Sequence, residues 1–342
     1  MAVYISGRYY RVGGQIIVPS LGNIGYASYQ GATTGGAGGE VLTATTLAQL
    51  TAALESPLPK VVYLEGNIYG GSTNSNYGIT TVGGNKSIFG KPGSSLNGIG
   101  IYFKNDVVNN KNGDNCIIKN VKFNPHFAGS VKRDLLSVEG GASRIHISHC
   151  EFSSNPTYND GSLDLSDNAD FVTVDHCKFT GAMLTSLAGS GGDVNKNRFT
   201  FAFNYWLNNM ERNPSCAHGK IHVLNSLYEH INPYPTETSF IGYGIGSRNL
   251  AIVRADSNYF KNYKGNPLAT INSSGTVPYG QFSGISTNFR DATSLNHKLN
   301  GVVESTWIPP YDYSGYLLPV MDVPAYVYSN AGQTLTLSQI GL

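Results

Sequence analysis

Three aspartates are spaced so that they can meet at one site. Asp134 and Asp160 are separated by roughly 26 residues, a length that suits one unit of a repeating fold. Asp160 and Asp164 are separated by an even number of positions, which on a strand places two side chains on the same face. Carboxylates that converge on one face repel each other unless a cation joins them, and their oxygens suit Ca²⁺. The alternative is that these acidic residues simply face water at turns.

Two histidine–cysteine pairs are a second candidate for chemistry. His149-Cys150 and His176-Cys177 recur at a separation similar to that of Asp134 and Asp160. A metal site would need each His and its Cys to point at one ion, whereas adjacent residues of a strand face opposite ways. We therefore interpret the pairs as two packing ladders, one of histidines and one of cysteines.

Short repeated strands must position these residues. Apolar runs end in an aromatic residue and are followed by polar or glycine turns. The closing aromatics are Phe123, Phe152, Phe179, Tyr205, Tyr228 and Phe260. Their gaps range from roughly 23 to roughly 32 residues, and a repeat of this length, with strands and no helices, indicates a solenoid in which each repeat is one coil. The spacing of Asp134 and Asp160 is then close to one coil.

The repeat predicts an all-β parallel β-helix. Successive coils pair in parallel about 4.8 Å apart, so equivalent side chains form ladders. Asn120, Asn204 and Asn225 come just before closing aromatics, where stacked amides can satisfy each other and the turn backbone. The rival fold is an antiparallel sandwich, whose turns recur at intervals of roughly 8–12 residues, and the longer period disfavours it.

Both ends of the chain depart from the repeat. One short helix is expected near 46–54, with Thr46 as its cap and leucines at helical spacing, followed by a buried strand over 60–64. After about residue 265 the repeat fades into a Pro- and Tyr-rich tail that includes 306–319 (TWIPPYDYSGYLLP). We expect this irregular tail to pack along the exterior and to cover one end of the stack.

No linker is visible, so we expect one domain over residues 1–342. An N-terminal segment and its capping helix would occupy 1–60, the coils 61–265, and the last coils with the irregular tail 266–342.

Composition excludes several classes of protein. The chain of 342 residues is 40% hydrophobic and 13% charged, with 41 Gly and 22 Tyr, which is typical of a folded protein of short strands and turns. A net charge of +1 without a basic run argues against a nucleic-acid partner. Four cysteines without CxxC spacing argue against a disulfide scaffold and against a zinc site.

The sequence indicates no membrane anchor. No apolar stretch approaches the ~18 residues that a transmembrane helix needs, and the N-terminal stretch lacks the apolar core of a signal peptide. Either a secretion signal has been removed, or the protein reaches the exterior in another way, as a phage tail protein released by lysis would.

Several segments, in this order, resemble the pectate lyase family of parallel β-helix polysaccharide lyases. The resemblance covers roughly residues 30 to 332. The segments are 31–39 (GATTGGAGG), 86–90 (KSIFG), 116–123 (CIIKNVKF), 133–137 (RDLLS), 144–152 (RIHISHCEF), 160–165 (DGSLDL), 170–174 (DFVTV), 212–214 (RNP) and 219–225 (GKIHVLN). Each segment alone is weak evidence, but their order and spacing together are strong.

The resemblance implies a single-stranded right-handed parallel β-helix and a calcium-dependent β-elimination on a uronate-containing polysaccharide. Asp134, Asp160 and Asp164 match the family's calcium positions, and Arg212 matches the catalytic arginine of its Arg-x-Pro-x-x-Arg motif. In such enzymes calcium holds a uronate carboxylate, and the arginine removes the neighbouring proton. The alternative for Arg212 is a structural arginine paired with a carboxylate.

The chain departs from the family pattern at three positions. Leu184 stands at the position of a lysine that contacts substrate, and Ala217 at that of the second motif arginine. Lys132 stands at a further calcium position, where a lysine would lower the affinity for the cation or itself bind the substrate. His218 and Lys220 are candidates to replace some of the lost charge, or else plain surface residues. The loss of two cations favours a substrate with fewer or differently spaced carboxylates than homogalacturonan.

Four aromatic residues could stack on sugar faces, although tyrosine is so frequent that packing is the alternative for each. They are Tyr158, Tyr205, Trp206 and Tyr234.

Three functions remain open from the residues. The first is a lyase that acts outside the cell as a monomer on an acidic polysaccharide, without a nucleic-acid or membrane partner. The second is a glycoside hydrolase with Asp160 and Asp164 as its acid and base, which leaves 212–214 unexplained. The third is a trimeric phage tail-spike-like protein that binds or cleaves a bacterial surface glycan, although the C-terminus shows no heptad run.

Overall fold

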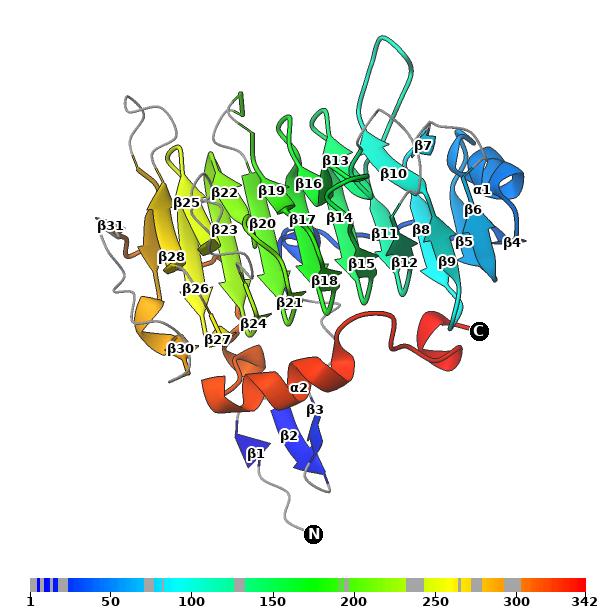
Figure 1. Ribbon diagram of the computed structural model, residues 1–342. Helices are drawn as coiled ribbons and strands as arrows, with labels where there is room; N and C mark the ends of the chain where they lie inside the picture. The colour runs from blue at the N-terminus through cyan, green and yellow to red at the C-terminus, as the bar shows by residue number, and fades with distance from the viewer. Residues whose placement is uncertain are drawn as a thin grey trace.

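The protein folds into a right-handed parallel β-helix, as the sequence predicts (Figure 1). The computed structural model describes residues 5–6, 9–12, 15–17, 24–70, 77–81, 83–125, 133–190, 192–193, 197–231, 243–263, 266–271, 279–291 and 303–342. Three long parallel sheets wind around one hydrophobic core. Within the described residues, no helix is long and apolar enough to span a membrane.

Most coils contribute one strand to each sheet. Sheet I consists of β7 (Tyr77–Thr80), β10 (Ile99–Lys104), β13 (Leu136–Glu139), β16 (Gly161–Leu165), β19 (Leu184–Ala188), β22 (Ser215–Ala217), β25 (Tyr243–Arg248) and β28 (Asn266–Ile271). Sheet II consists of β4 (Glu40–Ala44), β5 (Lys60–Leu64), β8 (Lys86–Gly90), β11 (Cys116–Lys119), β14 (Ser143–Ser148), β17 (Asp170–Asp175), β20 (Asn197–Ala202), β23 (Gly219–Leu224), β26 (Ile252–Asp256), β29 (Gln281–Ser283) and β31 (Val303–Glu304). Sheet III consists of β6 (Asn67–Tyr69), β9 (Ser95–Asn97), β12 (Lys122–Asn124), β15 (Glu151–Ser153), β18 (Lys178–Thr180), β21 (Tyr205–Leu207), β24 (Leu227–Glu229), β27 (Tyr259–Lys261) and β30 (Phe289–Arg290).

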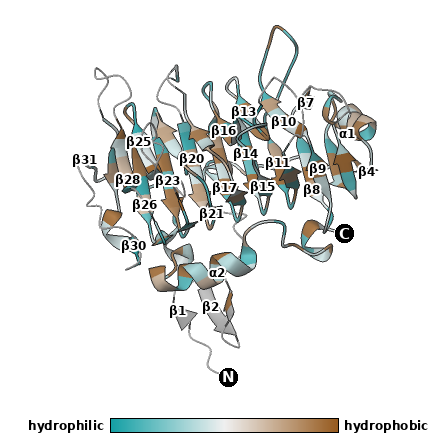
Figure 2. Ribbon diagram, in the orientation of Figure 1, coloured by the Kyte–Doolittle hydropathy of each residue, from teal (hydrophilic) through white to brown (hydrophobic). Residues whose placement is uncertain are grey.

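An aromatic ladder inside sheet III fixes the register of the coils. The rings of Phe123, Phe152 and Phe179 stack with centroids 5.0 and 4.9 Å apart and planes inclined by only 2°. All three side chains are fully buried. Because alternate residues of a strand face opposite ways, the polar neighbours of these rings point outward, and hydrophobic and hydrophilic residues interleave along the strands (Figure 2).

The ladder continues through Trp206 rather than Tyr205, so the sequence prediction is wrong by one residue in this coil. Trp206 is in register with Phe179 and with Tyr228, and it is fully buried. The hydroxyl of Tyr205 points outward and donates a hydrogen bond to Glu229 at 2.7 Å. Trp206 therefore belongs to the core and cannot stack on a sugar.

The asparagines before the closing aromatics bind backbone groups, and they do not bind one another as we expected. Asn204 donates to the carbonyl of Val174 at 3.0 Å and accepts from the amide of Cys177 at 2.8 Å. Asn120 and Asn225 instead bond the backbone of the C-terminal segment, residues 311–342. Buried backbone groups that lack a partner in a sheet need such bonds, so the side-chain amides are engaged there and not with each other.

The expected N-terminal helix is confirmed as α1 (Leu47–Leu54). Thr46 accepts from the amide of Gln49, and the Gln49 side chain in turn accepts from the amide of Thr46. These two bonds form a capping box, which satisfies donors that the first turn leaves unpaired. Farther towards the N-terminus, β1 (Ile5–Ser6), β2 (Tyr9–Val12) and β3 (Gln15–Ile17) form a separate antiparallel sheet.

The C-terminal segment packs along the exterior of the stack as expected, but it is not wholly irregular. It contains a second helix, α2 (Val323–Asn330), and it runs along the flank of the stack (Figure 1). We did not predict this helix from the sequence because it is short and begins beside a proline. The contacts of the segment run backwards along the coils: Tyr316 with Asn225, Tyr326 with His176, Leu335 with Asn120, and Ile340 with Tyr63.

Short 3₁₀ turns complete the connections. They are η2 (Tyr26–Ser28), η3 (Ile285–Thr287), η4 (Ser314–Tyr316), η5 (Val320–Asp322) and η6 (Ser338–Ile340).

The aromatic ladder yields a test of what stabilises the stack. Phe152→Ala should lower the free energy of unfolding by about 3–5 kcal/mol, because it leaves a cavity between two rings that cannot close. Chemical denaturation monitored by circular dichroism measures this change. The control Tyr69→Ala, at a side chain 64% exposed, should change the free energy by less than about 0.5 kcal/mol. Equal effects of the two variants would refute the ladder as the source of stability.

Candidate active site

The three aspartates gather at the edge where two coils enter sheet I. Asp134 precedes β13, Asp160 directly precedes β16, and Asp164 lies within β16. Asp164 is paired with Ser137 of β13, which brings the two coils side by side here. The amide of Gly161 donates to Asp134 Oδ1 at 2.8 Å, so Asp134 reaches across to the coil that carries the other two carboxylates.

A glycine permits the carboxylates to approach each other. A Cβ atom on Gly161 would lie 2.9 Å from Asp134 Oδ1 and 3.1 Å from Asp164 Oδ1. At contacts this short a larger residue would force the Asp134 carboxylate to shift and would press on that of Asp164. Both oxygens therefore border one small space above the backbone of β16. Nothing in the sequence marked Gly161 for this role beyond its place between two aspartates.

The carboxylates are held close together at an electrostatic cost. Burial, and next the charge of Asp160, raise the pKa of Asp134 to about 6. Burial, and next the charge of Asp134, raise the pKa of Asp164 well above its ordinary value. Hydrogen bonds from the Ser137 hydroxyl and from the Leu187 amide offset part of this cost. Among the described residues none of the three carboxylates has an ion-pair partner, so a cation would relieve their repulsion.

Arg212 lies two coils farther along the stack than Asp160 and Asp164, at the start of the coil that contains β22. It adopts the left-handed backbone conformation with φ 59°, and its carbonyl accepts from the Ser186 amide at 2.8 Å. Its side chain is 32% exposed, and its charge lowers the pKa of Asp164 against the larger effect of burial.

The alternative role for Arg212, a structural ion pair, has little geometric support. Its Nε atom lies 3.9 Å from Glu211 Oε1, beyond hydrogen-bond distance. Burial raises the pKa of Glu211 even though Arg212 opposes the shift, which shows that the arginine compensates this carboxylate only weakly. The guanidinium of Arg212 is thus available at the surface of sheet I.

The other predicted substrate residues are dispersed. The chain passes from sheet I to sheet II at the corner formed by His218 and Gly219, so Lys220 lies on β23 of sheet II. Its side chain is exposed there. His218 lies at this corner, where burial lowers its pKa. The structure therefore does not bring Lys220 to the aspartates. Lys132 and Tyr234 lie outside the described residues.

Two further predicted positions lie on or near sheet I. Leu184 starts β19 and is paired directly with Gly161, so an apolar side chain borders the aspartates in the next coil. Tyr158 lies in the turn just before Asp160 and is half-buried.

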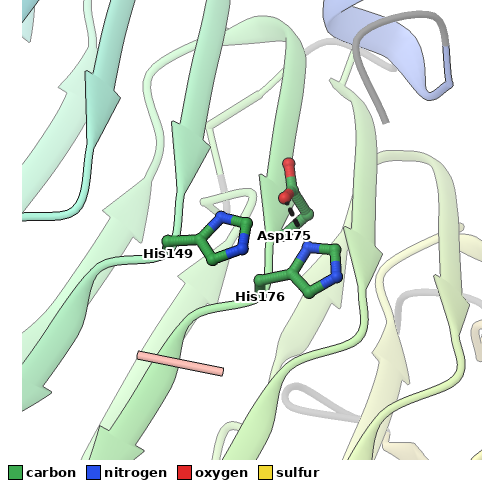
Figure 3. Close-up of side chains that lie close together, drawn as sticks. All are labelled: His149, Asp175 and His176. Carbon is green, nitrogen blue, oxygen red and sulfur yellow. Dashed lines mark hydrogen bonds and ion pairs between the residues drawn. The ribbon is translucent and has the colours of Figure 1, made fainter. Parts of the chain in front are cut away.

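The histidines and cysteines form ladders, as interpreted from the sequence. The rings of His149 and His176 stack with centroids 4.5 Å apart and planes inclined by 9°. His149, Asp175 and His176 bring ligand-type atoms within 4.8 Å of one another, but Figure 3 shows the two rings parallel, with one carboxylate above their edge. Parallel rings direct their nitrogen lone pairs along parallel lines, so the lone pairs do not converge on one ion. Cys150 and Cys177 are buried and free of disulfides.

Comparisons with known proteins agree with this fold. The model of the pectate lyase family matches residues 17–335. Pectate lyase B of Colletotrichum gloeosporioides is 32% identical over 335 residues, which cover 95% of this chain and 89% of that protein. The pectate trisaccharide-lyase of Bacillus licheniformis is 30% identical, over 90% of this chain and 85% of that protein. A solved pectate lyase of Bacillus sp. N165, in complex with trigalacturonate, superposes with a TM-score of 0.74 at 25% identity, over 91% of this chain and 99% of that one.

These findings define a polysaccharide lyase built on a parallel β-helix. The chain belongs to the pectate lyase family, which confirms the resemblance found in the sequence.

The raised carboxyl pKa values predict how stability depends on pH. Folding raises the pKa of Asp134 from 3.8 to about 6, so between these values the folded protein binds more protons than the unfolded chain. In a chelator, the free energy of unfolding contributed by this group should therefore fall as pH rises from about 4 to 6 and stay low above that. Calcium should raise the melting temperature by a few degrees at pH 8 and hardly at all at pH 4, where the carboxyls are protonated.

The variant Asp134→Asn separates this effect from general electrostatics. It should stabilise the protein at pH 8 in chelator and abolish the response of the melting temperature to calcium. Asp167→Asn is the matched control, since Asp167 is an exposed aspartate at the turn before β17 and should leave both properties unchanged. A calcium response that survives in Asp134→Asn would place the cation elsewhere.

Proposed function

We propose that this protein is a calcium-dependent pectate lyase that cleaves a polygalacturonate-like polysaccharide by β-elimination, with Arg212 as the base. The observation that carries the proposal is the crowding of Asp134 and Asp164 around one space, next to an arginine whose ion pair with Glu211 is long, at 3.9 Å. The names of the relatives, and the trigalacturonate in one solved structure, support pectate as the substrate class. Because the substrate is a polymer, the proposal includes an extracellular site of action, and it takes the protein to act as a monomer.

The residues present fit a calcium ion. Asp134, Asp160 and Asp164 supply only oxygen donors, which hard cations prefer, and the hydrogen bonds to Asp134 and Asp164 offset only part of the cost of their burial. When bound, calcium would neutralise these carboxylates and attract a uronate carboxylate of the substrate, which makes the neighbouring C–H more acidic.

The protein residues would then carry the elimination. Arg212 would accept the proton from the carbon that bears the carboxylate, for which its guanidinium must first be neutral. Nearby positive charge and alkaline pH both favour the neutral form of a base. As the proton leaves, its electron pair forms the carbon–carbon double bond, and the bond from the next carbon to the glycosidic oxygen breaks. The oxygen keeps the bonding pair and takes up a proton to become a hydroxyl, while Arg212 gives up the proton that it accepted. No water is consumed, so the new chain end is unsaturated.

Substitution of Arg212 tests the proposed base. Arg212→Ala should lower kcat on polygalacturonate by a factor of about 10²–10⁴, the usual contribution of a positioned general base. Arg212→Lys should keep KM near its original value and lower kcat, since lysine retains the charge but not the guanidinium geometry. The measurement is the ultraviolet absorbance of the unsaturated product at alkaline pH, with excess calcium or with a chelator.

The control is Arg144→Gln, because Arg144 lies on sheet II and bonds the carbonyl of Gly31 at 2.7 Å, far from the aspartates in the fold. It should behave like the unmodified protein. Reducing ends that form without absorbance would instead indicate a glycoside hydrolase. Absence of both signals on all uronate polymers would leave binding of a glycan, as in a tail-spike-like protein, and would refute the proposal.

A further inference from the structure

Arg248 reaches across two neighbouring coils on the outer face of sheet I. It ends β25 and is paired in register with Ala217 of β22. Its Nε donates to the hydroxyl of Ser215 at 3.0 Å, and its Nη2 donates to the carbonyl of Gly189, one coil farther back, at 2.9 Å. The side chain therefore lies flat on the sheet and runs towards the aspartates. Ala217 is fully buried, and its methyl group leaves room for the arginine to pass over it.

The guanidinium of Arg248 is placed at an electrostatic cost. Burial lowers its pKa, and the charge of Arg212 lowers it further. Both of its hydrogen-bond partners, Ser215 and Gly189, are neutral groups. Among the described residues Arg248 forms no ion pair with a carboxylate. A partly desolvated cation beside a second cation is stabilised only when an anion joins them.

The position of this pair of arginines suits a polyanion. Asp164 is paired with Leu187, and Leu187 with Ser215, so the hydroxyl that holds Arg248 lies two coils beyond the aspartates in the same row. One end of this row therefore carries the negative charges of the aspartates, which a bound metal ion would neutralise. The other end carries the positive charges of Arg212 and Arg248. A linear chain with a carboxylate on each sugar, lying across the coils, would meet both ends.

We propose that Arg248 binds a carboxylate of the substrate chain beyond Arg212, and so selects for uronate units that carry no methyl ester. The inference rests on the proposed lyase function and extends it to substrate specificity. The guanidinium is a planar fork that suits a carboxylate, and Ser215 and Gly189 fix its orientation in advance, which lowers the entropy lost on binding. Arg248 is thus a substrate-binding residue supplied by the coil after the one where the sequence motif lacks its second arginine.

The bonds to Ser215 and Gly189 also admit a purely structural role, in which Arg248 ties three coils together. The two roles differ in their dependence on substrate charge. A structural tie affects every substrate alike, whereas a carboxylate contact matters only where the substrate carries a charge.

The experiment compares polygalacturonate with partially methyl-esterified pectin. In Arg248→Gln, KM for polygalacturonate should rise roughly tenfold with kcat within about twofold, as expected for the loss of one charge-assisted hydrogen bond. For the esterified pectin kcat/KM should fall less, so that the preference for polygalacturonate shrinks several-fold. Arg248→Lys should restore part of the preference, and Arg144→Gln should leave it unchanged. Circular dichroism and melting temperature verify the fold of each variant.

An equal fall of kcat/KM on both substrates, or no change on either, would overturn the role of Arg248 in selection. Failure of the lyase proposal is recognised separately, because the unmodified protein would then form no unsaturated product from either polymer. In that case the dissociation constants of oligogalacturonate for the unmodified protein and for Arg248→Gln still test the carboxylate contact. A weaker affinity in the variant supports it, and equal affinities overturn it.

Discussion

Parallel pairing of successive coils, residue against residue, is the constraint on which the rest of this structure depends. It places each side chain next to its counterpart one coil away, so that like groups meet like. Inside the helix this arrangement is favourable, because Phe152 lies face to face with Phe123 and Phe179 and each ring excludes water from the next. On the outer face of sheet I the same arrangement gathers carboxylates at one place and guanidinium groups at another, which is unfavourable until ligands of opposite charge arrive. The energy that stabilises the stack thus allows it to hold a site that would not assemble on its own.

The electrostatics of the site follow from this balance. Asp134 and Asp164 lie where burial and mutual repulsion raise the pKa of both carboxyls, while the backbone amides of Gly161 and Leu187 hold their oxygens in place. These donors are backbone amides in the strands of sheet I, so the carboxylates can relax apart only if they give up these hydrogen bonds. Such preorganisation is what a cation site or a catalytic site requires, since the cost of assembly has been met in folding.

The sequence predicted those features that depend on period and side-chain type. The spacing of aromatic residues revealed the coils, and the spacing of Asp134 and Asp160 correctly suggested that the two belong to neighbouring coils. It did not predict features that depend on exact register, because the gaps between closing aromatics differ from coil to coil. For this reason the ladder was assigned to Tyr205 instead of Trp206, and Lys220 was assigned to the site although it lies beyond a corner on sheet II. Helix α2 was missed since it is short and lacks a strong amphipathic pattern.

Arg248 shows why motif positions alone describe such a surface poorly. In the sequence, Ala217 stands where the family motif has its second arginine, and Arg248 is a distant residue of no evident role. In the sheet, however, Ala217 and Arg248 are paired in adjacent strands. The small side chain of Ala217 leaves room for the side chain of Arg248 to lie over it. A cation that moves by one coil remains on the same face, but it is displaced by the strand spacing of about 4.8 Å. On a repetitive substrate such a displacement changes which sugar carboxylate is contacted. The register of the coils can therefore convert a pair of substitutions distant in sequence into a change of substrate preference, with the fold and the carboxylate cluster left intact.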